Sequence, residues 1–296
     1  MSNDRRNPRR LGTSRSARAV RCAALTLLLA GGVASAPAAQ AAPAAPAQGT
    51  PRVRLDLAGL KARLAAGTAS KTPDLSHADL RGLDLEGLDF HHADLSGASL
   101  DSARLAGANL FSCNLTDASA VGADLRKANL DGTVLRRADF RRANLAGASL
   151  FATIIEAADL SGANLSGTRI IGYLHKARLV GATLVNANIG ADPGNQSMGV
   201  MRATFVSADL SGADLSGANL YKADFSYATL AGAKLDHADL RNADLIQTDF
   251  TRADLTGAKL AKADIAGADF TGAIGVDRIE GLAEARHREK ATFDAH

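Results

Sequence analysis

The chain has 296 residues, of which 4% are aromatic and 28 are Gly, and it contains no Trp. So few large side chains argue against a bulky mixed core. The formal charge of +3 comes from the N-terminus, because residues 1–41 hold seven Arg and one Asp, and the remaining 27 basic and 30 acidic residues give −3. These numbers exclude a basic nucleic-acid binder, and two Cys residues exclude a disulfide-stapled scaffold.

The first 41 residues predict a signal peptide. Residues 1–21 are rich in Arg and Ser, and the apolar stretch 22–36 is too short to span a bilayer, which needs about 20 residues. Ala39-Gln40-Ala41 is a small-x-small cleavage site, so we expect cleavage after Ala41. Both Sec and twin-arginine export stay open, with an uncleaved membrane anchor as the alternative. The mature chain is expected in the periplasm, in the cell envelope or outside the cell.

Two short segments precede the main repeat. Residues 42–51 are a Pro/Ala-rich linker that buries too little apolar surface to fold. Apolar residues at helical spacing then predict an amphipathic helix over 52–66, within an N-terminal cap of 52–72. These apolar residues are Val53, Leu57, Leu60 and Leu64.

A five-residue period dominates the rest of the chain. Apolar residues recur at every fifth position over 75–170, 174–189 and 205–270, and 37 of these 38 positions hold Leu, Ile or Phe. Two residues earlier, 29 of the 38 positions hold Ala, and the residue between is often Asp or Asn. In an α-helix a five-residue step rotates a side chain by about 140°, so these residues would form no face, which excludes a helix.

An extended segment accounts for the period. Residues two apart in a strand point the same way, so Ala and Leu both face inward and the residue between them faces outward. The two residues after Leu, which often include Gly, must then turn the chain. Repeated sides and turns close a coil, and stacking of coils overrides the weak strand propensity of Ala, Asp and Gly.

The A(D/N)Lxx pattern, intact in Ala208-Asp209-Leu210, resembles the pentapeptide-repeat family over residues 73–272. The resemblance implies an all-β fold: a right-handed quadrilateral parallel β-helix, or solenoid, with four pentapeptides per coil and the central Leu or Phe inside.

The ends of such a stack are open sheet edges that need covering. We expect short helical caps there. The helix over 52–66 would cover one end, and a second helix over 276–290, within a C-terminal cap and tail of 273–296, would cover the other.

The period is interrupted twice. One residue is lost between Ile170 and Leu174, and a loop insertion is expected at 190–202, where Pro193-Gly194-Asn195 signals a turn. The loop carries Met198 and Met201, adaptable apolar residues that are candidate contacts for a partner. A tolerated insertion without a function is the alternative.

Charged residues supply further candidates. Six basic residues are expected at outward turn positions of neighbouring coils, where they would suit phosphate or an anionic polymer. They are Arg126, Lys127, Arg136, Arg137, Arg141 and Arg142. A solvated cluster that aids solubility is the alternative. Residues 20 apart should stack, which places Asp84 next to Arg104 on the neighbouring coil. The same rule stacks Asp139 on Asp159, and Asp224, Asp244 and Asp264 on one another, as acidic columns without a stacked basic residue.

No catalytic constellation stands out in the sequence. The repeat itself places the outward Asp residues, so carboxylate pairs do not indicate acid–base catalysis. His91-His92 and the nearby His77 have no further Cys or His at metal-ligand spacing, so we expect neither a metal nor a cofactor. Cys113 stands at an inward position and is expected to be a buried structural thiol.

We therefore expect an exported, non-enzymatic scaffold that binds a protein or an anionic envelope polymer, with no membrane span in the mature chain. A homodimer through an end cap stays open. The resemblance also implies an alternative, because some family members resemble duplex DNA and occupy a type II topoisomerase. A net charge of only −6 over the repeat and the export signal argue against it. A polysaccharide-active β-helix enzyme is the second alternative.

Overall fold

The computed structural model describes residues 53–67, 72–191 and 201–294. Parallel bridges join residues 20 apart on successive coils, such as Asp79 with Ser99, and successive bridges within a coil are five residues apart. Four columns of bridging residues therefore run along the stack. We call them column A (Asp79 to Thr292), column B (Asp84 to Ile274), column C (Asp89 to Glu280) and column D (Asp74 to Arg286).

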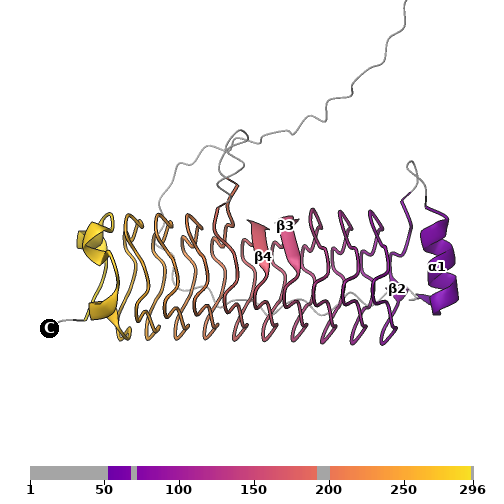
Figure 1. The fold of residues 1–296 in the computed structure, drawn as a ribbon, viewed down its shortest axis with the longest axis horizontal. Coiled ribbons are helices and arrows are strands. Elements are labelled where there is room, and N and C mark those ends of the chain that lie inside the picture. Colours follow the sequence, from indigo (N-terminus) through magenta and orange to yellow (C-terminus); the bar gives the residue numbers. More distant parts are fainter. Residues whose placement is uncertain (1–52, 68–71, 192–200, 295–296) are drawn as a thin grey trace, which may run out of the picture. The chain divides into compact units, whose positions relative to one another are not determined.

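Few segments are long enough to count as strands in the described part of the chain. Strand β1 (Val53–Arg54) pairs in parallel with β2 (Ala78–Asp79), and β3 (Ser149–Ile154) pairs in parallel with β4 (Arg169–Tyr173). Isolated bridges make the other contacts between coils. Figure 1 shows the coils side by side, with helix α1 (Leu57–Ala65) at the N-terminal end of the stack.

The interior of the coils is filled as the period predicts. The Ala and Leu of each repeat are buried, as Ala163 and Leu165 illustrate, and Ala120 is buried although it interrupts the Leu series. Aromatic residues stack on one another between coils: the rings of Phe205 and Phe225 have centroids 4.7 Å apart and lie 9° from parallel. Burial of this apolar column is the main stabilising contribution to the stack.

The turns are closed by backbone hydrogen bonds, and many of them also by a side-chain hydrogen bond. The carbonyl oxygen of Leu95, for example, accepts the N–H of Ala98, and Gly97 between them has a φ of +63°. The outward Asp or Asn accepts the N–H of the residue two positions later, as Asn164 does from Ser166 at 3.0 Å. The Asp and Asn of the repeat therefore have a structural role as Asx turns.

Both interruptions of the period keep the coils stacked. The four-residue step from Ile170 to Leu174 is accommodated by a register shift in β3 between Phe151 and Thr153. A Cβ on Gly172 would lie 2.3 Å from the Thr153 carbonyl oxygen, so only Gly fits there. At the second interruption, bridged residues such as Tyr173 and Thr204 are 31 residues apart. Residues 192–200 of this insertion lie outside the described residues.

Helix α1 covers the first coil, as expected, although it begins at Leu57 rather than at residue 52. The Asp56 side chain caps it by accepting the Gly59 N–H at 2.7 Å. Leu60 is fully buried within the core, and Leu64 packs against the core. The two residues of β1 extend the ladder of the first coil instead of joining the helix.

The predicted C-terminal helix over 276–290 is wrong. This segment forms three short 3-10 helices, η2 (Val276–Arg278), η3 (Leu282–Glu284) and η4 (Arg288–Lys290). The bridging residues that flank these helices are six apart and pair with the preceding coil, so the segment forms one more coil, wider than the others. These residues are Ile274, Glu280, Arg286 and Thr292. Stacking on the preceding coil therefore overrides the helical spacing of the apolar residues.

Candidate interaction surface

The six predicted basic residues do not form one patch. Arg126 and Lys127 follow column B, Arg136 and Arg137 follow column D, and the last pair, Arg141 and Arg142, follows column A. They are exposed at turns of neighbouring coils, as expected, but they occupy three different turns of the coil.

Four of the six basic residues are paired with carboxylates. Arg126 and Arg141 each donate two hydrogen bonds to the Asp two positions earlier, at 2.7–2.8 Å for Asp124 and 2.6–2.8 Å for Asp139. These hydrogen bonds hold the pKa of Asp124 below its usual value and raise the pKa of the Arg141 guanidinium.

The other two pairs join neighbouring coils. Arg137 donates to Asp117 at 2.5 and 2.7 Å, and Arg136 lies 3.3 Å from Glu156. In the described part of the chain, only Lys127 and Arg142 of the six lack a carboxylate partner. Most of the positive charge is therefore neutralised locally, which weakens the argument for an anionic-polymer site.

The supposed unrelieved acidic columns are in fact neutralised, and that expectation is wrong. Arg202 donates to both Asp224 (3.1 Å) and Asp244 (2.5 Å), and Arg286 reaches Asp244 at 3.4 Å. These arginines come from the start of a coil after the insertion and from the last coil, so they are distant in sequence from the carboxylates.

Asp264 and Asp159 are neutralised in the same way. Burial raises the pKa of Asp264, but the hydrogen bond with His287 (2.9 Å) and the charge of Arg286 outweigh it and leave that pKa lowered. Asp159 lies 3.7 Å from Arg178, and Asp139 is paired with Arg141.

An apolar stripe interrupts the polar surface of column D. Three successive positions hold Val134, Ile154 and Tyr173, which are bridged to one another in register. Polar Asn114 precedes and polar Thr204 follows. The Tyr173 side chain is 58% exposed. We call these three residues the apolar stripe. The sequence analysis did not identify it, although three apolar residues at the outward position of successive coils are a visible signal.

The ring of Tyr173 is held by its neighbour on the following turn. The His175 ring meets it edge to face with centroids 6.0 Å apart, and His175 Nε2 is 2.8 Å from Thr204 Oγ1. An exposed aromatic ring with restricted freedom loses little entropy on binding, which suits it to contact another protein.

Of the two candidate methionines, Met201 lies within the described residues. Met201 is half-buried at the start of the coil that contains Thr204, and Met198 lies outside the described residues. His91 and His92 pack together with Phe111, with ring centroids 4.0–5.9 Å apart. In residues 53–67, 72–191 and 201–294 no group of three or more His, Cys, Asp or Glu could hold a metal ion.

Cys113 is buried as predicted, and its thiol donates to the Phe90 carbonyl oxygen at 3.1 Å. Burial raises the pKa of this thiol to about 12, which removes it as a nucleophile near neutral pH. Within the described ranges, no helix is both long and apolar enough to cross a membrane. The predicted signal peptide (1–41) and linker (42–51) lie outside these ranges.

Comparison with known proteins places the chain in a family. The family model for pentapeptide repeats matches in eight copies, over residues 74–110, 113–151, 128–170, 203–242 and 238–274. No curated protein sequence matches the chain. HetL, a pentapeptide repeat protein involved in heterocyst differentiation regulation from the cyanobacterium Nostoc sp. strain PCC 7120, has a solved structure. It is 30% identical, with a TM-score of 0.57, and the match covers 82% of this chain and 100% of HetL.

Two other solved structures match less well. A trypsin-treated QnrB1 variant, a plasmid-mediated fluoroquinolone resistance protein, is 19% identical with a TM-score of 0.32, over 66% of this chain and 88% of QnrB1. The pentapeptide repeat protein alr5209 from Nostoc PCC 7120 is 34% identical with a TM-score of 0.31, and the match covers 39% of this chain and 84% of alr5209. These two add nothing to the fold assignment. The family match and HetL imply a right-handed β-helix, and the chain belongs to the pentapeptide-repeat family.

Proposed function

We propose that the protein is an exported, non-enzymatic scaffold that binds a protein partner through the apolar stripe. The observation that carries this proposal is the presence of Val134, Ile154 and Tyr173 at bridged outward positions of adjacent coils, where the repeat otherwise places polar residues. Tyr173 is 58% exposed, and Val134 and Ile154 are partly buried. We also infer that the four columns are the four sides of a quadrilateral coil, so that the stripe lies on a single flat side.

The charge arrangement supports a protein rather than an anionic polymer as the partner. An anionic polymer would need a continuous row of free cations, whereas Arg126, Arg136, Arg137 and Arg141 are engaged by carboxylates. An apolar centre with Tyr at its end, bordered by paired charges, has the anatomy of a protein–protein contact. HetL, which matches over its whole length, takes part in regulation, and binding without catalysis would suit such a role.

Site-specific photocrosslinking in cells tests the proposal, because the chain offers a matched control. Tyr173 lies in the stripe, whereas Tyr227 is a similarly exposed tyrosine (56%) at a turn. A photoreactive phenylalanine analogue at position 173 should give a discrete adduct with a protein, and the same analogue at 227 should not. Equal adducts at both positions, or none at 173, would refute the stripe.

Export is tested separately by cell fractionation with N-terminal sequencing. Cleavage after Ala41 is the expected result. Uncleaved cytoplasmic protein that inhibits supercoiling by a type II topoisomerase would contradict the proposal and support the DNA-mimic alternative. Hydrolysis of a polysaccharide would contradict the non-enzymatic part.

A further inference from the structure

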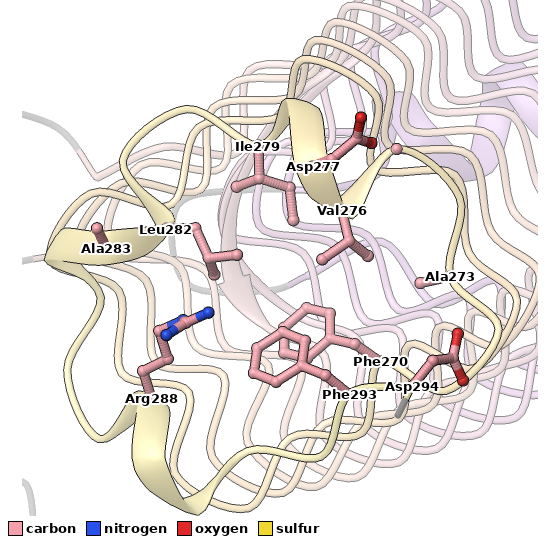
Figure 2. A pocket seen from close by; sticks show the side chains of 11 residues that line it. Phe270, Ala273, Val276, Asp277, Ile279, Leu282, Ala283, Arg288, Phe293 and Asp294 are labelled. Carbon is pink, nitrogen blue, oxygen red and sulfur yellow. The ribbon is translucent and has the colours of Figure 1, made fainter. Parts of the chain in front are cut away.

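The C-terminal end of the stack is hollow. A cavity of about 590 Å³ opens there, inside the range of about 300–1,000 Å³ that is usual for small-molecule sites. Figure 2 shows Val276, Ile279, Leu282 and Phe293 around this hollow. It is separate from the apolar stripe, so its role is independent of the proposed scaffold function.

The hollow lies in the last coil of the described residues, which is wider than the others, and no further coil within residues 201–294 covers it. Its bridging residues are six apart instead of five, so its lumen is larger. Phe293 stacks on Phe270 with centroids 5.0 Å apart, and Phe270 stacks on Phe250 at 5.1 Å. Val276 and Leu282 pack against this core but are only partly buried. Apolar surface is therefore left open at the floor of the hollow.

The charges at the rim are not equivalent. The Asp277 carboxylate lies 3.8 Å from Arg278, and the Asp294 carboxylate accepts the Gly272 N–H at 3.0 Å. Arg288, in contrast, has no carboxylate partner among the described residues. Its guanidinium carbon lies 5.4 Å from the centroid of the Phe293 ring.

Figure 2 shows how these groups are directed. The Arg288 guanidinium turns toward the apolar centre of the hollow, whereas the carboxylates of Asp277 and Asp294 point away from it. The group that faces the apolar floor is thus a cation without a counter-ion, which favours a ligand with an apolar body and a negative head group.

We propose that the hollow binds a free alkyl carboxylate of medium chain length. The chain would contact Val276, Leu282 and Phe293, and the carboxylate would accept hydrogen bonds from the Arg288 guanidinium. Burial of the chain supplies most of the binding free energy, and the guanidinium selects the sign of the head group.

Isothermal titration of the full chain with monomeric laurate tests this proposal. We expect laurate to bind more tightly than dodecyltrimethylammonium, which has the same chain and the opposite charge. Arg288→Gln should weaken laurate binding about tenfold, the loss expected for one charge-assisted hydrogen-bond partner. Lys290→Gln is the matched control, because it removes an exposed positive charge two residues away that does not line the cavity. It should leave laurate binding unchanged.

Four results would overturn the proposal. Equal affinity for the two probes, or for the Arg288→Gln and Lys290→Gln variants, would show that Arg288 does not select the ligand. A concentration-dependent dimer by sedimentation that takes up no laurate would show that a second copy covers the hollow. Flotation with phosphatidylglycerol vesicles, in the absence of laurate binding, would assign the hollow to a membrane surface.

Discussion

Replacement of Arg202 by Met tests the charge network along column D. The Arg202 guanidinium lies between Asp224 and Asp244, which are bridged directly to each other on neighbouring coils. Adjacent coils are about 4.8 Å apart. Without the guanidinium, two carboxylates at that spacing repel by about 1 kcal/mol in water and about 3 kcal/mol at an effective dielectric of 20.

The lower part of that range applies here. Arg286 still reaches Asp244 at 3.4 Å, and the Arg202 side chain is 33% exposed, so solvent screens the interaction. We expect the free energy of unfolding of Arg202→Met to fall by about 1–2 kcal/mol, which corresponds to a thermal midpoint about 3–6 °C lower.

Thermal unfolding followed by circular dichroism measures the effect, with Arg252→Met as the matched control. Arg252 is an exposed turn residue without a carboxylate partner in the described part of the chain, so its loss should change the midpoint by less than about 1 °C. The difference between the variants should shrink in 1 M NaCl, where the Debye length is about 3 Å. An equal drop for both variants, or a difference that persists in 1 M NaCl, would refute the reasoning.

Three further changes test other parts of the fold. Hydrogen bonds from Arg81 lower the pKa of Asp79 to about 2, so this pair stabilises the fold fully above the usual carboxyl pKa of about 4 and loses its effect as the pH falls toward 2. The difference in thermal midpoint between the wild type and Asp79→Asn should therefore disappear as the pH falls from about 4 toward 2. A difference that stays constant over this pH range would contradict the pairing of Asp79 with Arg81. In a Cys22→Ser background, the Cys113 thiol, with a pKa of about 12, should not react with a disulfide reagent at pH 8 until denaturant is added, and loss of the signal in denaturant on adding Cys113→Ala identifies this thiol. Gly212 and Gly275 have φ values of +65° and +73°, but a Cβ would meet no atom within 4 Å at Gly212, whereas at Gly275 it would meet the backbone Cα and N of Thr256 at 2.7 and 2.9 Å. Gly275→Ala should lower the thermal midpoint more than Gly212→Ala, which should cost about 1 kcal/mol, and equal midpoints for the two variants would argue against that backbone contact.

The core of the fold could be predicted because it depends on a local rule. Ala and Leu two residues apart, repeated every five residues, fix which side chains face inward, and the burial of Ala163 and Leu165 follows from that spacing. The C-terminal coil could not be predicted in this way, because Val276, Ile279 and Leu282 also fit a helical period. The sequence nevertheless contains a signal for the coil, because Gly275 and Gly281 are six residues apart, and in the structure both have a positive φ.

The candidate interaction surface could be predicted less well, because many charged side chains pair with residues that are not 20 positions away in the same column. Arg202 and Asp244 are 42 residues apart, which is two coils and two residues, so the stacking of residues 20 apart does not by itself identify this pair. Arg141 pairs with Asp139 two positions before it, so a cluster that looks basic in the sequence is largely neutral in the structure. The apolar stripe, in contrast, could be found by inspecting only the outward position of each repeat.

The insertion after Ile189 has a consequence for how this molecule can change. Bridged residues on either side of it are 31 apart, yet Arg178, Thr183 and Asn188 keep their partners Asp209, Asp214 and Asn219 in order. Hydrogen bonds between coils run across the chain direction, so extra residues at one turn leave the bridges at the other three columns unchanged. A foreign peptide inserted at a turn should therefore change the structure only locally. The turns are thus positions at which the protein can acquire new binding segments.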